Sequence, residues 1–179
     1  MFCIIIIAIN ILVFFILPSE LKPIFAINIF FIELDYWWQL LSSMFLHSNF
    51  THLALNMIVL YQFGIVLERF LGSLKFLLLY FIGGVLSSLL SAFYVYYRSF
   101  QDEKFFNLLG ASGAICVLIG YYAFVHKNSF LGLLIVVLLM SFVPIFVGVN
   151  VAWYAHIFGF ICGYIIARLR IIRWKKFIC

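Results

Sequence analysis

The stretch NLLGASGAICVLIGYYAF, residues 107–124, sets a serine among small residues at the front of an apolar run. Ser112 follows Gly110 at a spacing of two and directly precedes Gly113. An apolar run of this length predicts a membrane helix over about 108–125. A serine in such a helix usually packs or bonds back to its own backbone, whereas neighbouring glycines let other backbones approach its hydroxyl.

The composition of the whole chain excludes a water-soluble domain. The 179 residues are 68% hydrophobic and 9% charged, with a mean hydropathy of +1.24. Soluble domains are about 45–50% apolar and about 25% charged. The net charge of +5 comes mainly from the last dozen residues and gives no nucleic-acid signal. The sequence therefore predicts a polytopic membrane protein embedded in a lipid bilayer.

The apolar runs predict an all-α bundle of six transmembrane helices in a single domain, residues 1–179. A spanning helix needs roughly 20 apolar residues. The first candidate lacks a basic n-region and a small-residue cleavage site, so we interpret it as an uncleaved span and not as a signal peptide. The six predicted spans are about 2–17, 52–67, 75–97, 108–125, 130–149 and 151–168.

Loop charges predict the orientation of these spans. With the N-terminus in the cytoplasm, the inside segments hold eight of the eleven basic residues: Arg69, Lys75, Lys127, Arg168, Arg170, Arg173, Lys175 and Lys176. The other basic residues fall outside together with five of the six acids; Glu68 alone lies inside. The positive-inside rule then places both termini in the cytoplasm, and we expect a bacterial inner membrane.

The first outer loop, residues 18–51, is long and still apolar. Its Tyr36, Trp37 and Trp38 suit a membrane–water interface. We predict that the loop is partly helical and embedded in the outer leaflet without crossing it. An ordinary extracellular loop is the alternative.

Polar residues recur at the outer ends of three predicted spans, where hydrocarbon makes them costly and often functional. His52 and Asn56 are four residues apart and share a helix face. Ser112 opens the fourth span, where free backbone N–H groups and the helix dipole favour negative charge. His156 opens the sixth. Each residue taken alone could simply join neighbouring helices by hydrogen bonds.

A stripe of small residues accompanies His156 in the sixth span. Ala155, Gly159 and Gly163 are spaced by four, which predicts close packing against a neighbouring helix. Such packing would bring the His156 imidazole to the facing residue. A serine beside a histidine is a nucleophile–base pair, and because no carboxylate lies at this depth, the simplest arrangement is a Ser112–His156 dyad.

Cysteine and histidine spacings predict neither a disulfide framework nor a metal or cofactor site. Cys3, Cys116, Cys162 and Cys179 show no C-x-x-C spacing and read as small buried hydrophobes. A zinc site on His52 and His156 lacks a third ligand.

Taken in order, the motifs resemble the rhomboid intramembrane serine proteases. They are H-x-x-x-N at 52–56, G-x-S-G at 110–113 and A-H-x-x-G-x-x-x-G at 155–163. Their placement on the second, fourth and sixth spans agrees, and the chain resembles the minimal six-span bacterial form.

The resemblance implies a role for each matching residue. Ser112 would be the nucleophile, and His156 the general base and later the general acid. His52, Asn56 and the Ser112 backbone N–H would form the oxyanion hole, with Gly110 lining it.

The resemblance also gives supporting roles and exposes two departures. Gly113 and Gly159 would allow close contact around the site, and Glu68 would be structural. Gln39 follows Trp38 where the family often has arginine. Cys116 stands where many members place a tyrosine under the catalytic histidine.

These features predict an endopeptidase that cleaves membrane helices of single-pass proteins from a cavity open to the outer side. Substrate would enter past the fifth span, 130–149, in which we identify no catalytic-type residue, and 144–150 would act as a cap. The alternatives are a catalytically inactive rhomboid-like protein that binds membrane helices, and a small transporter or channel lined by His52, Asn56 and His156. The sequence does not predict an oligomeric state.

Overall fold

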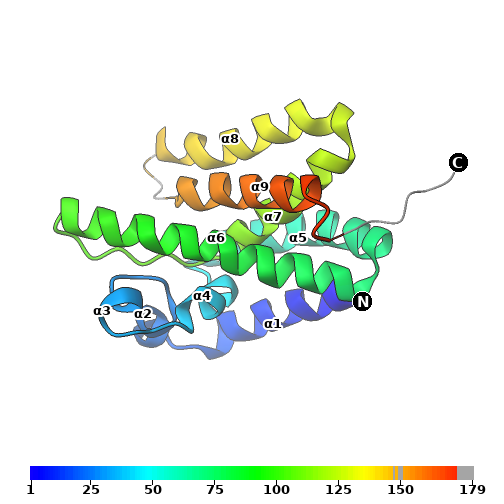
Figure 1. The fold of residues 1–179 in the computed structure, drawn as a ribbon. Coiled ribbons are helices and arrows are strands. Elements are labelled where there is room, and N and C mark those ends of the chain that lie inside the picture. Colours follow the sequence, from blue (N-terminus) through cyan, green and yellow to red (C-terminus); the bar gives the residue numbers. More distant parts are fainter. Residues whose placement is uncertain (147, 149–150, 173–179) are drawn as a thin grey trace, which may run out of the picture.

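The computed structural model describes residues 1–146, 148 and 151–172 (Figure 1). Within these residues the chain is helical apart from loops and one isolated β-bridge. The elements are α1 (Phe2–Ile16), η1 (Ser19–Leu21), α2 (Lys22–Phe25), α3 (Phe30–Glu33), α4 (Gln39–Ser42), η2 (Ser43–Phe45), α5 (Phe50–Leu71), α6 (Ser73–Gln101), α7 (Ser112–Val125), η3 (Lys127–Ser129), α8 (Phe130–Phe146) and α9 (Trp153–Arg168).

A helix stands at each of the six positions where a span is predicted, which confirms the all-α fold. By length and composition, α5, α6 and the continuous segment Lys127–Phe146 can cross a membrane. The α1 helix forms a bent pair with Ser19–Phe25, at 109°, that can count as a fourth span. With 14 residues, α7 is about 21 Å long, less than the roughly 30 Å hydrocarbon core. Six full spans remain a prediction.

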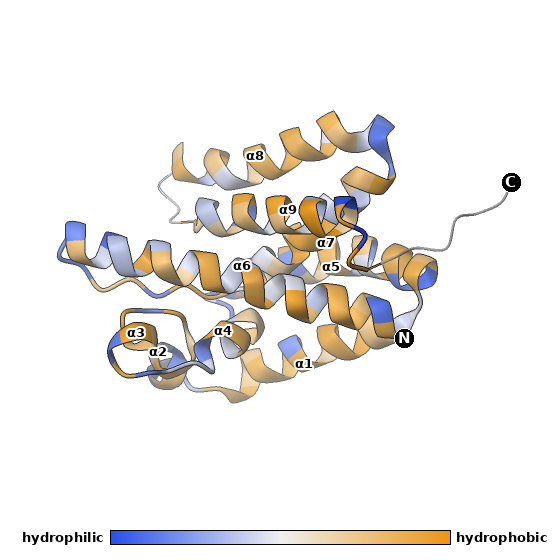
Figure 2. Ribbon diagram, in the orientation of Figure 1, coloured by the Kyte–Doolittle hydropathy of each residue, from blue (hydrophilic) through white to orange (hydrophobic). Residues whose placement is uncertain are grey.

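The helices around α7 are composed largely of hydrophobic residues (Figure 2), and many of their apolar side chains are exposed on the bundle. Large exposed side chains include Leu55 on α5, Phe93 on α6 and Leu139 on α8. In the segment Lys127–Phe146, only 11% of the most apolar window is buried, against 33% for α5 and 50% for α6. The α8 helix is therefore the least embedded of the three long apolar helices.

The α7 and α9 helices pack backbone against backbone at their glycines. A Cβ added at Gly159 would lie 2.2 Å from the Gly113 carbonyl oxygen, and one at Gly163 would lie 1.9 Å from that of Val117. In the reverse direction, a Cβ at Gly120 would lie 2.0 Å from the Phe160 carbonyl oxygen. At these three glycines there is no room for a side chain, so the register between the two helices is fixed by backbone contact.

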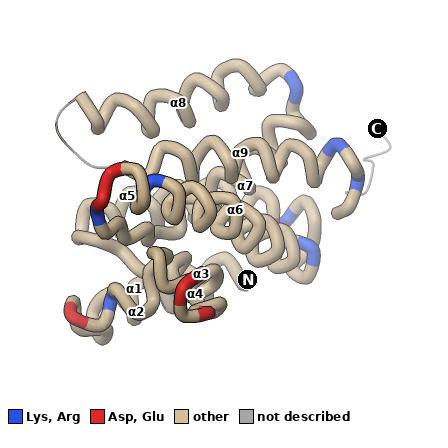
Figure 3. Tube along the Cα trace, turned by 60° about the vertical axis from the view of Figure 1, so that its left-hand side comes forward, with Lys and Arg blue, Asp and Glu red and all other residues tan. Residues whose placement is uncertain are grey.

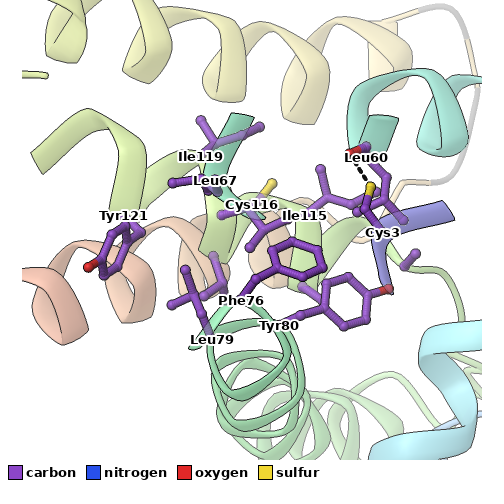
Figure 4. Packing of buried hydrophobic residues seen from close by; sticks show 14 of the residues in the cluster. Cys3, Leu60, Leu67, Phe76, Leu79, Tyr80, Ile115, Cys116, Ile119 and Tyr121 are labelled. Atoms are coloured by element: carbon purple, nitrogen blue, oxygen red, sulfur yellow. Dashed lines mark hydrogen bonds between the residues drawn. The ribbon is translucent and has the colours of Figure 1, made fainter. Parts of the chain in front are cut away.

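The apolar core surrounds α7 and joins α1, α5, α6 and α9 to it. Figure 4 shows Phe76 and Tyr80 of α6 beside Ile115 of α7 and Cys3 of α1. Close-packed side chains of this kind hold the central helix in one position.

Glu68, near the end of α5, caps the first turn of α1. Its carboxylate oxygens accept hydrogen bonds from the backbone N–H groups of Phe2 (2.8 Å) and Cys3 (2.9 Å). The Ser73 hydroxyl donates a third bond at 2.7 Å. The carboxylate thus satisfies donors that a helix start leaves free, and it joins α1 to the α5–α6 turn.

The loop over residues 18–51 is partly helical, as η1, α2, α3, α4 and η2 lie within it. Its position relative to the membrane stays a prediction. Fully buried Gln39 accepts from the Asn28 backbone N–H (3.3 Å) and donates to the Ile24 carbonyl (3.3 Å). Gln39 therefore crosslinks the loop from the position where the family resemblance led us to expect an arginine.

Most charged residues lie near the two ends of the bundle (Figure 3). Basic residues at the end of α5, the start of α6, in η3 and at the end of α9 are Arg69, Lys75, Lys127, Arg168 and Arg170. The segment from η1 to α3 and the loop after α6 carry the acids Glu20, Glu33, Asp35, Asp102 and Glu103, together with the cations Lys22, Arg98 and Lys104. The remaining predicted inside cations, Arg173, Lys175 and Lys176, lie outside the described residues.

Candidate active site

The chain reaches Ser112 as an extended segment, so the fourth helix begins four residues later than the predicted 108. Leu108 and Ile27 exchange backbone hydrogen bonds of 2.9 and 2.8 Å. The Gly110 N–H donates to the Ser43 carbonyl at 2.9 Å, and its φ of +133° is closed to most side chains. Pairing with the first loop therefore keeps this backbone out of the helix.

Ser112 is the first residue of α7 and is buried, with 8% of its surface exposed. No side chain caps this helix start. The first-turn N–H groups of α7, which have no intrahelical acceptor, thus lie beside the Ser112 hydroxyl at the positive end of the helix dipole. An anion forming at this point is stabilised by both effects.

Gly110 brings the His52 ring and the Ser112 hydroxyl to the two sides of one small space. A Cβ at Gly110 would lie 2.8 Å from His52 Cε1, 2.9 Å from its Nε2 and 3.7 Å from Ser112 Oγ. On the far side of the ring, His52 Nδ1 lies 3.1 Å from the Ser48 hydroxyl. The Nε2 edge of His52 therefore borders Gly110, next to the Ser112 hydroxyl.

Asn56 follows His52 by one helical turn and holds an unused hydrogen-bond donor. The residue is buried at 5% exposure, and its Nδ2 has no partner. A buried amide without a partner is costly and calls for an explanation. A ligand or reaction intermediate that accepts this hydrogen bond would supply one.

His156 lies in the first turn of α9 and is buried at 5% exposure. The α7–α9 glycine contacts set Ala155 and His156 beside the start of α7, and a Cβ at Gly113 would lie 3.7 Å from the Ala155 carbonyl oxygen. Within the described part of the chain, no hydrogen bond joins His156 to Ser112. Catalytic hydrogen bonds are often long without substrate and tighten when it binds.

Two buried serines at this site were missed by reasoning from the sequence. Ser141 of α8 lies 3.1 Å from His156 Nδ1, so the segment 130–149 contributes a polar contact to the candidate site that we did not predict. Ser87 of α6 donates to the Ala155 carbonyl at 3.2 Å. Both serines could have been noticed in the sequence, because each is a hydroxyl side chain within an apolar run, as Ser112 is.

No aromatic ring occupies position 116, and the cysteine there is buried in the α7–α9 interface. A Cβ at Gly159 would lie 3.0 Å from the Cys116 Cβ. Cys116 is fully buried and packs in the core. Orientation of the His156 ring must therefore come from another neighbour.

His47 lies between η2 and α5, outside the long helices, with its ring 5.0 Å from that of His52. Burial, with smaller contributions from His52 and Lys22, lowers the pKa of His47 to about 3. The ring is therefore neutral at physiological pH and packs beside His52 without adding charge.

A small cavity lined largely by hydroxyl groups and glycines adjoins Ser112. The elements that border it are η2, α6, the extended segment, and the starts of α7 and α9. Its lining residues are Ser43, Met44, Ser87, Ser88, Ser91, Leu108, Leu109, Gly110, Ser112, Gly113, Ala114 and Ala155. The cavity has room for about one water molecule.

A family model described as "Rhomboid domain" matches residues 34–173. The chain belongs to the rhomboid family. As in that family, it is an integral membrane protein with apolar helices. Rhomboid membership thus covers the segment holding all the candidate site residues.

Curated rhomboid proteins from several organisms are similar to this chain. It is 32% identical over 140 residues to the putative rhomboid protease YdcA of Bacillus subtilis, covering 74% of this chain and 67% of that protein. It is 39% identical to rhomboid protease AarA of Providencia stuartii, covering 51% and 36% respectively. It is 33% identical to rhomboid protease GluP of Bacillus subtilis, covering 73% of this chain and 25% of that protein. The chain thus spans about a third of the length of AarA and a quarter of the length of GluP.

Proposed function

We propose that this rhomboid protein is an intramembrane serine endopeptidase. The observation that carries the proposal is the position of Ser112, at the uncapped start of α7, beside the Gly110 backbone that the Nε2 edge of His52 also borders. Asn56, one helical turn after His52, holds an unused donor. His156 comes beside the same helix start through the α7–α9 backbone contacts. Names of similar proteins, several of them rhomboid proteases, support the same activity.

In the proposed reaction, Ser112 and His156 transfer one proton back and forth. The imidazole takes the hydroxyl proton of Ser112 as Oγ bonds to the scissile carbonyl carbon. It then gives that proton to the leaving amine as the C–N bond breaks. Water attacks the acyl-enzyme ester, its proton passes through His156 to Ser112 Oγ, and the new carboxyl end is released.

Charge on the carbonyl oxygen is stabilised by donors that are already in place. The Ser112 backbone N–H, the His52 ring and Asn56 Nδ2 would donate to it, and Gly110 leaves the space that it occupies. Donors fixed before the reaction cost no reorganisation when the charge develops. The unused Asn56 donor fits this role because its partner exists only during catalysis.

The substrate we propose is a membrane helix of a single-pass protein, unwound near the cut. Entry past α8 is favoured because α8 is the least embedded long apolar helix. The small cavity beside Ser112 favours a small residue before the scissile bond. Of the proposed cap at 144–150, Pro144 lies in α8 and Gly148 in a turn, while Asn150 lies outside the described residues.

We further propose that the site opens to the extracytoplasmic side of a bacterial inner membrane, with both termini in the cytoplasm. The excess of basic residues in the predicted inside segments supports this orientation. At about 21 Å, α7 is shorter than the hydrocarbon core, and such a short helix would leave room for water to reach Ser112 at its start.

The deciding experiment reconstitutes the protein in liposomes with a labelled single-span substrate. We expect Ser112→Ala and His156→Ala to abolish cleavage, and Ser19→Ala, which alters an exposed serine of η1, to leave it unchanged. A serine-directed covalent probe should label the unsubstituted protein and not Ser112→Ala. Cleavage by Ser112→Ala at the rate of the unsubstituted protein would falsify the assignment, and labelling without cleavage of any substrate would favour a helix-binding role.

A further inference from the structure

Ser141 connects α8 to the candidate general base. Its hydroxyl oxygen lies 3.1 Å from His156 Nδ1, and both residues are buried, at 0% and 5% exposure. Ser141 and Val137 are the buried residues of α8. Ser141 is also the only residue of that helix with a polar side chain. The contact is thus the one polar side-chain link between α8 and α9 that the described residues contain.

The hydrogen bonds of Ser141 decide which nitrogen of His156 carries a proton. A serine hydroxyl has one proton to donate and two lone pairs to accept with. Ser141 Oγ is 2.6 Å from the Val137 carbonyl oxygen, which can only accept, so the serine proton points there. Toward His156 the hydroxyl can then only accept, and Nδ1 must carry the hydrogen. The lone pair of Nε2 is left free.

We propose that Ser141 is a positioning residue that holds His156 in the tautomer required of the base. This inference rests on the proposed function, because a free Nε2 is what proton abstraction from Ser112 needs. Serine proteases commonly use a third group to orient the histidine. Here the Glu68 carboxylate is engaged at α1, and no ring lies at position 116. The hydroxyl of Ser141 performs the orienting task from α8.

Because Ser141 belongs to α8, the orientation of the His156 base depends on whether α8 is packed against α9. The neighbouring Phe142 stacks on Trp153 of α9, with ring centroids 5.7 Å apart, and so holds α8 at the height of His156. If α8 moves away from α9, Nδ1 loses its acceptor. The base is then oriented only while α8 is docked, which links proteolysis to closure of the proposed entry side.

Two isosteric substitutions separate the hydrogen bond from packing. Ser141→Thr keeps a hydroxyl that can bond the carbonyl four residues earlier, whereas Ser141→Val adds the same bulk without it. We expect Ser141→Val to lower kcat by about 10- to 100-fold, as misorientation of a catalytic group does. KM should change less than about twofold in both variants, because Ser141 is buried, and Ser141→Thr should recover most of the loss. Equal kcat values for the two variants would overturn the proposal.

A second measurement reads the tautomer without requiring activity. In Ser112→Ala protein with ¹⁵N-labelled histidine, the His156 signal is identified by its loss in a further His156→Gln substitution. In Ser112→Ala, with or without Ser141→Thr, we expect the signature of a hydrogen on His156 Nδ1. With Ser141→Val added to Ser112→Ala, we expect a mixture of tautomers or the tautomer with its hydrogen on Nε2. An unchanged signature in Ser141→Val would refute the positioning role. If the tautomer signature is as expected but the protein with Ser112 intact cleaves no substrate, the proposed function is refuted. The positioning geometry would still stand.

Discussion

At the scale of single residues, the site holds its donors ready before any substrate is bound. Asn56 Nδ2 is buried with no acceptor, and the Nε2 edge of His52 borders the space left by Gly110. Leaving a buried donor unsatisfied costs about 1–3 kcal/mol. The proposed oxyanion role of Asn56 would account for this cost, because its acceptor would form only during the reaction.

Removing the Asn56 donor should slow the reaction without abolishing it. We expect Asn56→Ala to lower kcat by about 10²–10³-fold, the usual effect of losing one oxyanion donor. Single-turnover cleavage in liposomes measures the loss. The control, Asn128→Ala, alters an exposed amide in η3 and should have no effect. A loss in Asn56→Ala as complete as in His156→Ala would contradict the division of roles.

At the scale of elements, the site depends on one helix pair. The α7–α9 interface is formed by backbone atoms facing glycines, so it fixes the offset of Ser112 against His156 more tightly than side-chain packing would. Because α7 also lies in the middle of the core, a shift between the two helices would disturb most of the bundle.

A methyl group at Gly163 should destabilise the fold. Its Cβ would overlap the Val117 carbonyl oxygen at 1.9 Å, and backbone cannot move aside as a side chain can. We expect Gly163→Ala to lower the free energy of unfolding by about 1–3 kcal/mol, the range for overpacking. Gly132→Ala in α8, which meets nothing within 4 Å, is the control and should match or exceed the parent stability in a thermal melt in detergent. Equal destabilisation in both variants would rule out the steric explanation.

At the scale of the whole molecule, α1 is held to the rest of the bundle by a carboxylate cap and apolar contacts. Glu68→Ala leaves the Phe2 and Cys3 N–H groups without their acceptor. We expect the loss to cost about 1–3 kcal/mol and to lower the melting temperature in detergent. Glu20→Ala, an exposed carboxylate in η1, should leave the melting temperature unchanged. Unaltered melting of Glu68→Ala would mean that apolar contacts alone dock α1.

The charge distribution predicts which end of the molecule faces the cytoplasm. Lys104→Cys and Lys127→Cys remove the same charge, one in the loop after α6 and the other in η3 after α7. In intact cells, a membrane-impermeant thiol reagent should label Lys104→Cys above the background of the native cysteines and should label Lys127→Cys only after lysis. The reverse pattern would overturn the orientation.

Much of the architecture follows from the sequence because hydrocarbon restricts the choices. Backbone groups in lipid must bond internally, so apolar runs become helices, and helices stand at all six predicted positions. Small residues at every fourth position of 155–163 likewise predict a close helix contact. The motif residues Ser112, His156, His52 and Asn56 could be named from their spacing and depth alone.

Other features depend on partners far along the chain and are invisible to local pattern. The α7 helix starts at Ser112 and not at 108 because Leu108 pairs with Ile27 and Gly110 with Ser43. Ser141 reads as a packing residue in its own span, and it meets His156 only when α8 docks on α9. Periodicity thus determined which segments are helices and which residues could react. The close approach of distant backbones decided where the reactive helix begins and which neighbour orients its base.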